Sequence, residues 1–175
     1  VYYGHKVSGG RSHWKGDYVD GAASPLYPFG HGLGYTTFRI SDLSVTPDLA
    51  TWNGEVTVSA SVTNTGDRDG DEIVQLYIRD PVASVTRPVL ELKGFARVGL
   101  PAGGAARVTF DLPVGQLGFY NRDLEYVVEP GSIDVLVGTS SADLEVAGSF
   151  SVVPDPDGRS VVKQFDGSSA VIPLP

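Results

Sequence analysis

Cysteine is absent from this chain of 175 residues, and so is methionine. Without cysteine the chain can form neither a disulfide nor a thiolate metal site, and a cysteine nucleophile is excluded. A chain of this length can bury a sizeable apolar core, so it does not need covalent cross-links to fold. The lack of cysteine therefore leaves cytoplasmic, periplasmic and secreted locations all open.

Basic residues are in the minority. The chain has 13 Lys and Arg against 21 Asp and Glu, a net charge of −8. Such a chain repels phosphate backbones and anionic lipid surfaces, which disfavours nucleic-acid and membrane partners. No run approaches the ~20 apolar residues of a membrane-spanning helix, and the opening VYYGHKVSGG lacks the basic start and apolar core of a signal peptide. Position 1 is Val rather than Met, which indicates either a removed initiator or, equally well, an excised part of a longer chain.

Helical periodicity is also missing, and residues 113–120 form at most a single helical turn. The chain instead alternates apolar and polar residues, the pattern of half-buried strands. Residues 55–64 (EVTVSASVTN) alternate strictly, with four apolar residues on one face: Val56, Val58, Ala60 and Val62. Similar patterns predict strands at 36–45, 72–80, 106–112, 132–140 and 144–153.

Glycine, proline, asparagine and aspartate mark turns between these segments, at 64–71, 100–105, 120–123 and 129–132. Short strands with turns at this spacing predict an all-β protein, an antiparallel β-sandwich. Four residues are expected in its core: Val58, Leu76, Phe110 and Val135. The acidic residues of the predicted strands are expected to be solvated: Glu55, Glu72, Asp80, Glu91, Asp111 and Asp134.

The two ends of the chain differ from this middle part. Residues 1–35 are rich in glycine, serine and aromatic residues, which indicates irregular chain from a preceding domain. Residues 36–153 form the predicted sandwich, and residues 154–175 form a tail that opens with proline and aspartate. Two apolar patches in this tail, 161–165 and 170–174, either pair at a sheet edge or stay mobile.

Residues 27–38 read YPFGHGLGYTTF, which is neither a regular helix nor a regular strand because glycine and proline interrupt it. Joined to the predicted sandwich, this segment resembles glycoside hydrolase family 3, the β-glucosidases and β-xylosidases. The matching residues are Tyr27, Pro28, Phe29, Gly30, Gly32, Leu33, Tyr35 and Phe38. Gly34 departs from the family pattern, in which serine is usual. Further matches at 62–80, 87–104 and 129–141 extend the resemblance over residues 1 to about 153.

The resemblance implies that residues 1–35 end an α/β sandwich domain and that residues 36–153 form an immunoglobulin/fibronectin type III-like domain. It also implies an inter-domain hinge built from Tyr27, Pro28, Phe29, Gly30, Gly32, Leu33 and Tyr35. In this interpretation the aromatic residues insert into an interface, while glycine allows close backbone approach. An alternative is that they cap the sandwich's own core.

Retaining glycosidases use a carboxylate nucleophile and a carboxyl acid/base. The resemblance places both in regions outside this chain, so no catalytic residue is expected here and the chain alone should be inactive. Loops of the second domain rim the active site in the family, and residues 9–20 offer aromatic and planar polar groups for a sugar. The candidate rim residues are Arg11, His13, Trp14, Asp17 and Tyr18. The alternative is a surface loop in which Trp14 packs on the barrel domain.

No metal or cofactor is expected. Residues 67–72 (DRDGDE) begin like a calcium loop, but the bidentate glutamate that would complete a 12-residue loop is missing. The histidines, at 5, 13 and 31, lack zinc-ligand spacing. The expected partners are the remaining catalytic domains of the parent chain and, through them, a β-glycoside substrate, with a homodimer as an alternative.

A competing hypothesis is a non-catalytic carbohydrate-binding or adhesive fibronectin-like module. A binding module normally lines up exposed aromatic residues on one sheet face. The aromatic residues of the predicted sandwich are dispersed along the sequence, which weakens that hypothesis: Tyr77, Phe95, Phe119, Tyr120 and Tyr126.

Overall fold

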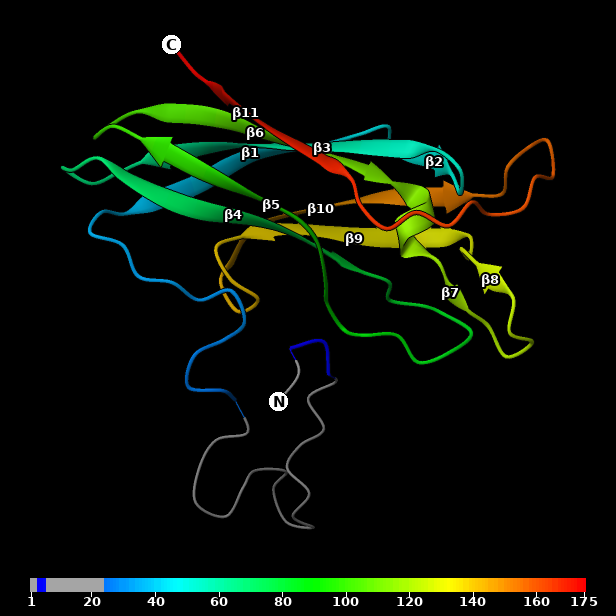
Figure 1. Cartoon of the computed structure of the whole chain (residues 1–175). Helices are drawn as coiled ribbons and strands as arrows, with labels where there is room; N and C mark the ends of the chain where they lie inside the picture. Colours follow the sequence, from blue (N-terminus) through cyan, green and yellow to red (C-terminus); the bar gives the residue numbers. More distant parts are fainter. Residues whose placement is uncertain (1–2, 6–23) are drawn as a thin grey trace, which may run out of the picture.

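The structure of the chain is a computed structural model, which describes residues 3–5 and 24–175. Two β-sheets pack face to face and a short hairpin lies at one end (Figure 1). The four-stranded sheet has the order β1-β3-β6-β11: β1 (Phe38–Thr46), β3 (Glu55–Asn64), β6 (Ala105–Pro113) and β11 (Ser168–Pro173). The five-stranded sheet has the order β2-β10-β9-β4-β5: β2 (Leu49–Thr51), β10 (Leu144–Val153), β9 (Gly131–Gly138), β4 (Gly70–Arg79) and β5 (Glu91–Leu100).

The connection from β6 to β9 contains the only helical turn in the described residues. The 3-10 helix η1 (Val114–Leu117) follows β6 directly and is fully buried. The hairpin of β7 (Phe119–Tyr120) and β8 (Tyr126–Val127) comes next and forms its own two-stranded sheet. The prediction of at most one helical turn at 113–120 is therefore confirmed.

Alternation explains most of the core. β3 pairs with β1 on one side and β6 on the other, so the inward residues of all three strands meet the second sheet. Val58, Leu76, Phe110 and Val135 are all buried, as predicted. The predicted all-β sandwich is confirmed, and β3 and β10 have the predicted bounds. β5 was not predicted, although it also alternates.

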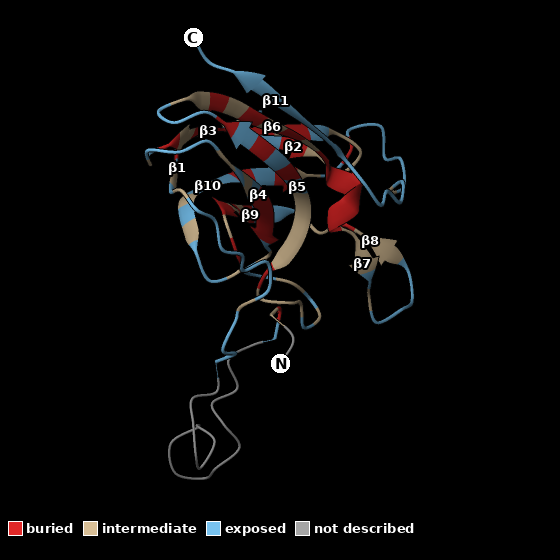
Figure 2. Cartoon of the chain, turned by 60° about the vertical axis from the view of Figure 1, so that its left-hand side comes forward, coloured by how far each residue is buried: buried red, intermediate tan, exposed pale blue. Residues whose placement is uncertain are grey.

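The tail contributes to the sandwich. β11 pairs antiparallel with β6 from Ser168 to Pro173, and all of its residues are exposed (Figures 1 and 2). Upstream of β11, the tail crosses the turn between β2 and β3. There the indole of Trp52 donates to the carbonyl oxygen of Arg159, at 2.9 Å, and the amide of Val162 donates to Asn53, at 2.8 Å. Of the two states left open for the patch at 170–174, the structure has the paired one.

β4 is buried on both faces near its end. Its inward residues Val74, Leu76 and Ile78 enter the core, while Gln75 and Tyr77 on the outer face are also buried. Something other than the second sheet therefore covers the outer face of β4.

No helix in the described part of the chain is long and apolar enough to cross a membrane.

Candidate inter-domain interface

The cover on β4 comes from the N-terminal part of the chain. We call residues 24–35 the interface segment; in Figure 1 it runs below the sandwich before joining β1. The ring of Phe29 stacks on the ring of Tyr3, with centroids 4.4 Å apart, and Tyr3 meets Tyr77 edge to face at 5.9 Å. The aromatic surface of β4 is thus covered by two segments that precede the sandwich.

Two hydrogen bonds to its backbone carbonyl oxygens fix the interface segment on the sandwich. The amide of Ser141, in the β9–β10 turn, donates to the carbonyl oxygen of Phe29 at 2.9 Å. The side-chain amide of Gln75 donates to the carbonyl oxygen of Gly30 at 3.1 Å and also to that of Thr139. Gln75 in turn accepts a hydrogen bond of 2.6 Å from the hydroxyl of Tyr77. Buried polar groups need such partners, so the segment completes the hydrogen bonding of this face.

Gly30 is required at this contact. Its φ is +80°, a left-handed conformation that a residue with a Cβ adopts only at a cost. A Cβ placed there would also lie 2.1 Å from Oε1 of Gln75. The glycine in the YPFG motif therefore serves a close backbone approach.

Burial changes the acidity of Tyr77. Its pKa is raised to about 12, first because burial penalises the phenolate and second because Tyr3 lies nearby. The phenol therefore stays protonated over the whole neutral range and remains a donor to Gln75.

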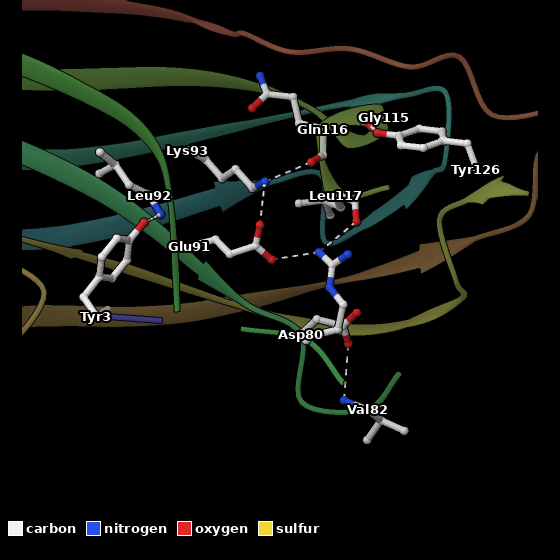
Figure 3. Close-up of polar contacts among 11 residues, drawn as sticks. Tyr3, Asp80, Val82, Glu91, Leu92, Lys93, Gly115, Gln116, Leu117 and Tyr126 are labelled. Atoms are coloured by element: carbon white, nitrogen blue, oxygen red, sulfur yellow. Dashed lines mark hydrogen bonds and ion pairs between the residues drawn. The ribbon is translucent and has the colours of Figure 1, made fainter. Parts of the chain in front are cut away.

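The loop between β4 and β5 reaches the same region. The amide of Val89 donates to the carbonyl oxygen of Gly4 at 2.9 Å, and the amide of Leu92 donates to the hydroxyl of Tyr3 at 3.0 Å. Figure 3 shows Tyr3 approaching the start of β5 from outside the sheet. Residues 3–5 are thereby tied to β5 while the interface segment is tied to β4.

A partly buried ion-pair network supports this loop (Figure 3). The carboxylate of Glu91 pairs with Arg87 at 2.8 Å and with Lys93 at 3.1 Å. Both cations also donate to the backbone that carries η1: Arg87 to the carbonyl oxygen of Leu117 and Lys93 to that of Gln116. The expectation that Glu91 is solvated is therefore wrong, because two cations brought in by the fold enclose it.

Asp80 lies beside this network at the end of β4. Its carboxylate accepts a hydrogen bond of 3.2 Å from the amide of Val82. Burial is the largest influence on this carboxyl group, and it raises the pKa of Asp80 despite the opposing effect of Arg87. Asp80 is half-buried, and this partial burial is enough to distinguish its carboxyl group from a freely solvated one.

The outer side of the interface segment is open. Leu33 and Tyr35 are 92% and 93% exposed, and Leu26 and Tyr27 are also exposed. Tyr27 stacks on His31, with ring centroids 5.3 Å apart. Several large apolar side chains on one short segment form the kind of surface that marks an interface.

Five of the seven predicted hinge residues fall into two groups. The backbone of Phe29 and Gly30 accepts hydrogen bonds from the sandwich, while Tyr27, Leu33 and Tyr35 are exposed. The candidate rim residues lie outside the described residues: Arg11, His13, Trp14, Asp17 and Tyr18.

Two carboxylates of the acidic loop at 67–72 make contacts within the sandwich. Asp69 accepts a hydrogen bond from the amide of Ala102, at 3.0 Å, and Asp71 pairs with Arg97 at 2.9 Å. Across residues 3–5 and 24–175, no group of three or more His, Cys, Asp or Glu could hold a metal ion.

The aromatic residues of the sandwich are less dispersed in space than in sequence. Phe119, Tyr120 and Tyr126 line one pocket together with Phe165 from the tail. Sequence reasoning missed this arrangement because Phe165 is far from the hairpin along the chain. Phe95 is separate from it, on β5, and is 63% exposed.

Comparisons with known proteins place these features in a family. Residues 72–141 match the model of the fibronectin type III-like domain. The chain is 40% identical over 160 residues to a periplasmic β-glucosidase of Salmonella typhimurium, covering 87% of this chain and 21% of that protein. It is 46% identical over 127 residues to a β-xylosidase of Formosa agariphila, covering 73% of this chain and 18% of that one.

Solved structures agree with these matches. The crystal structure of a β-glucosidase mutant from Listeria innocua in complex with laminaribiose superposes with a TM-score of 0.78. It is 37% identical, and the match covers 87% of this chain and 22% of that one. The chain therefore spans about a fifth of the length of these relatives. By these matches the chain carries a fibronectin type III-like domain and is similar to about a fifth of these β-glucosidases and β-xylosidases.

Proposed function

We propose that this chain is the C-terminal portion of a retaining β-glycosidase that acts on β-linked glucosides or xylosides. In this proposal the sandwich is an ancillary domain, and the interface segment holds it against the catalytic domains. The β-glucosidases and β-xylosidase among the relatives support the substrate class, and the short share of their length that this chain spans supports the existence of further domains.

One observation carries the docking role. The interface segment has an inner side bonded to β4 and an outer side that exposes Leu33 and Tyr35. A segment that only capped the sandwich would not need large apolar side chains on its outer side. Burying each of these side chains against a partner would contribute about 1.5–3 kcal/mol. The position of the catalytic residues outside this chain is proposed from the family resemblance alone. The same holds for the role of Arg11 and Trp14 at the rim of the active site.

A chimaera tests the docking role. Residues 1–175 would replace the matching part of the Listeria innocua β-glucosidase, and hydrolysis of a nitrophenyl β-glucoside would be measured together with thermal unfolding. We expect the chimaera to be active, and we expect Tyr35→Ser to lower both its activity and its unfolding temperature.

Phe95→Ser is the matched control, because Phe95 is an exposed aromatic residue on a different surface. It should leave activity unchanged. Equal behaviour of Tyr35→Ser and Phe95→Ser in an active chimaera would contradict the docking role of the outer side.

A further inference from the structure

The aromatic pocket defined above lies beside the β7–β8 hairpin. Its volume is about 380 Å³, within the range of about 300–1,000 Å³ typical of small-molecule sites. Its aromatic lining includes the rings of Tyr120, Tyr126 and Phe165. Its polar lining includes Lys93, Lys163 and Gln164.

The hairpin walls of the pocket are held in place by the protein itself. The hydroxyl of Tyr126 donates to the carbonyl oxygen of Gly115 at 2.8 Å, as Figure 3 shows, and Tyr120 meets Tyr126 edge to face at 5.5 Å. Gly118 has no space for a Cβ against the ring of Tyr126. The guanidinium of Arg87 lies 4.5 Å from the ring centroid of Phe119. These contacts preorganise the aromatic surface before any ligand binds.

The pocket also offers hydrogen-bond donors. The ammonium of Lys93 has three N–H donors, of which Glu91 and the carbonyl oxygen of Gln116 use two. The ammonium of Lys163 lies 5.0 Å from the ring centroids of both Tyr120 and Tyr126 and 5.2 Å from that of Phe165. Lys163 is exposed, and its hydrogen bond to the hydroxyl of Tyr120 is long, at 3.4 Å. Its side chain therefore lies across the rings without being firmly held.

The charges in the pocket narrow the class of ligand. A cation would compete with Lys163 for the ring faces and would be repelled by the ammonium group of Lys163. An anion would meet the negative faces of the aromatic rings and would find one exposed ammonium group, that of Lys163, because the charge of Lys93 is already balanced by Glu91. A neutral ligand with apolar C–H surfaces and several hydroxyl acceptors suits both the rings and the donors.

We propose that this pocket is a carbohydrate-binding site for a neutral β-linked glucose or xylose oligosaccharide. One pyranose ring packs its C–H face on Tyr120 and Phe165, and its hydroxyl oxygens accept hydrogen bonds from Lys93 and Gln164. The side chain of Lys163 turns aside and donates to the same sugar. The choice of glucose or xylose units rests on the proposed function, whereas the choice of a neutral sugar rests on the pocket.

Titration of the 175-residue chain with cellotetraose and, separately, with xylotetraose tests the site. Amide chemical shifts of the isotopically labelled chain would report both binding and its location. We expect saturable shifts in residues 119–127 and 163–166 for at least one of the two sugars. Since an aromatic contact contributes modestly, Tyr120→Ala and Phe165→Ala should each weaken binding roughly 3- to 10-fold.

Phe95→Ala is the control, because it removes an exposed aromatic side chain outside the pocket. It should leave the dissociation constant unchanged, and the spectrum of each variant shows whether it is folded. Added salt should not weaken the binding of a neutral sugar. The proposal is overturned if neither sugar produces saturable shifts, if the shifts lie elsewhere, or if salt or glucuronate displaces the sugar.

These outcomes are separate from those of the chimaera. Loss of the sugar site would leave the effect of Tyr35→Ser on the chimaera intact. Failure of the docking role would leave the titration of the isolated chain unaffected, and only the choice of glucose or xylose units would lose its support.

Discussion

Replacement of Gly30 by alanine should release the interface segment from the sandwich without unfolding the sandwich. The left-handed backbone at φ +80° costs a residue with a Cβ roughly 1–2 kcal/mol. The new Cβ would also lie 2.1 Å from Oε1 of Gln75, so the Gln75 side chain must move. Gln75 is buried and bonds the backbone of Gly30 and Thr139 and the hydroxyl of Tyr77.

The two costs combine. Displacing Gln75 from one or two of these bonds costs about 1–3 kcal/mol, because its partners stay buried. The docking equilibrium of the interface segment should therefore shift by about 2–5 kcal/mol. The core of β3 and β6 does not contact Gly30 and should keep its stability.

Amide hydrogen exchange measures this shift at a single site. The amide of Ser141 donates to the carbonyl oxygen of Phe29, so its protection reports docking of the segment. A change of at least 2 kcal/mol corresponds to roughly 30-fold faster exchange at this amide. Amides of β3 and β6 should exchange at unchanged rates.

Gly32→Ala is the matched control. No atom of the described residues lies within 4 Å of a Cβ placed at Gly32, and its φ is outside the left-handed range. The effect of this change should stay within about 0.5 kcal/mol. If both alanine variants give the same exchange rate at Ser141, the requirement for glycine at position 30 is refuted. If Gly30→Ala accelerates exchange throughout β3 and β6, the segment is part of the core rather than docked on it.

Four further outcomes are expected. Phe110→Ala should lower the unfolding free energy in urea by about 3–5 kcal/mol, while Phe95→Ala, at an exposed site, should change it by less than about 1 kcal/mol; similar losses would contradict the assigned core. Deleting residues 166–175 removes β11 and uncovers the edge of β6, so light scattering should detect self-association, and a monomeric product would argue against this role. Because the folded pKa of Tyr77 is about 12 and the ordinary value is 10.0, its contribution to stability is complete below about pH 10 and is lost as the pH rises toward 12. Urea titrations across that window should therefore show a steeper loss for the native chain than for Tyr77→Phe, and equal slopes would rule out the shift. The purified 175-residue chain should not hydrolyse a nitrophenyl β-glucoside, and turnover that copurifies with it through several columns would show that the chain carries its own catalytic groups.

The strands and the core could be read from the sequence because a half-buried strand alternates locally. β3 runs from Glu55 to Asn64 as its alternation predicts, and its inward residues are buried. β5 carries the same local signal at Leu92, Gly94, Ala96, Val98 and Leu100, and it could have been found. Small residues at inward positions make this alternation hard to recognise. Gly94 is one of them: the ring of Phe110 packs against it and would lie 3.0 Å from an added Cβ.

Other features exist only in the tertiary structure. Gln75 and Tyr77 occupy the outer positions of β4, where alternation predicts contact with solvent, yet the interface segment and Tyr3 bury them. Glu91 has the sequence pattern of a solvated strand residue, but Arg87 and Lys93 enclose it. In each case the residue is buried or paired by side chains that the alternation of its own strand does not predict.

The same holds for the tail and the aromatic pocket. Residues 168–173 show no alternation, and their strand forms because β6 offers an unpaired edge. Tyr120 and Phe165 belong to one pocket because the tail is tied to the β2–β3 turn before it passes the hairpin. A local period records which side of a strand faces the core of its own sheet pair. The local alternation carries no information on which distant segment covers the other side of the strand. The covering segment is determined by hydrogen bonds and ring contacts between parts of the chain that are far apart in sequence.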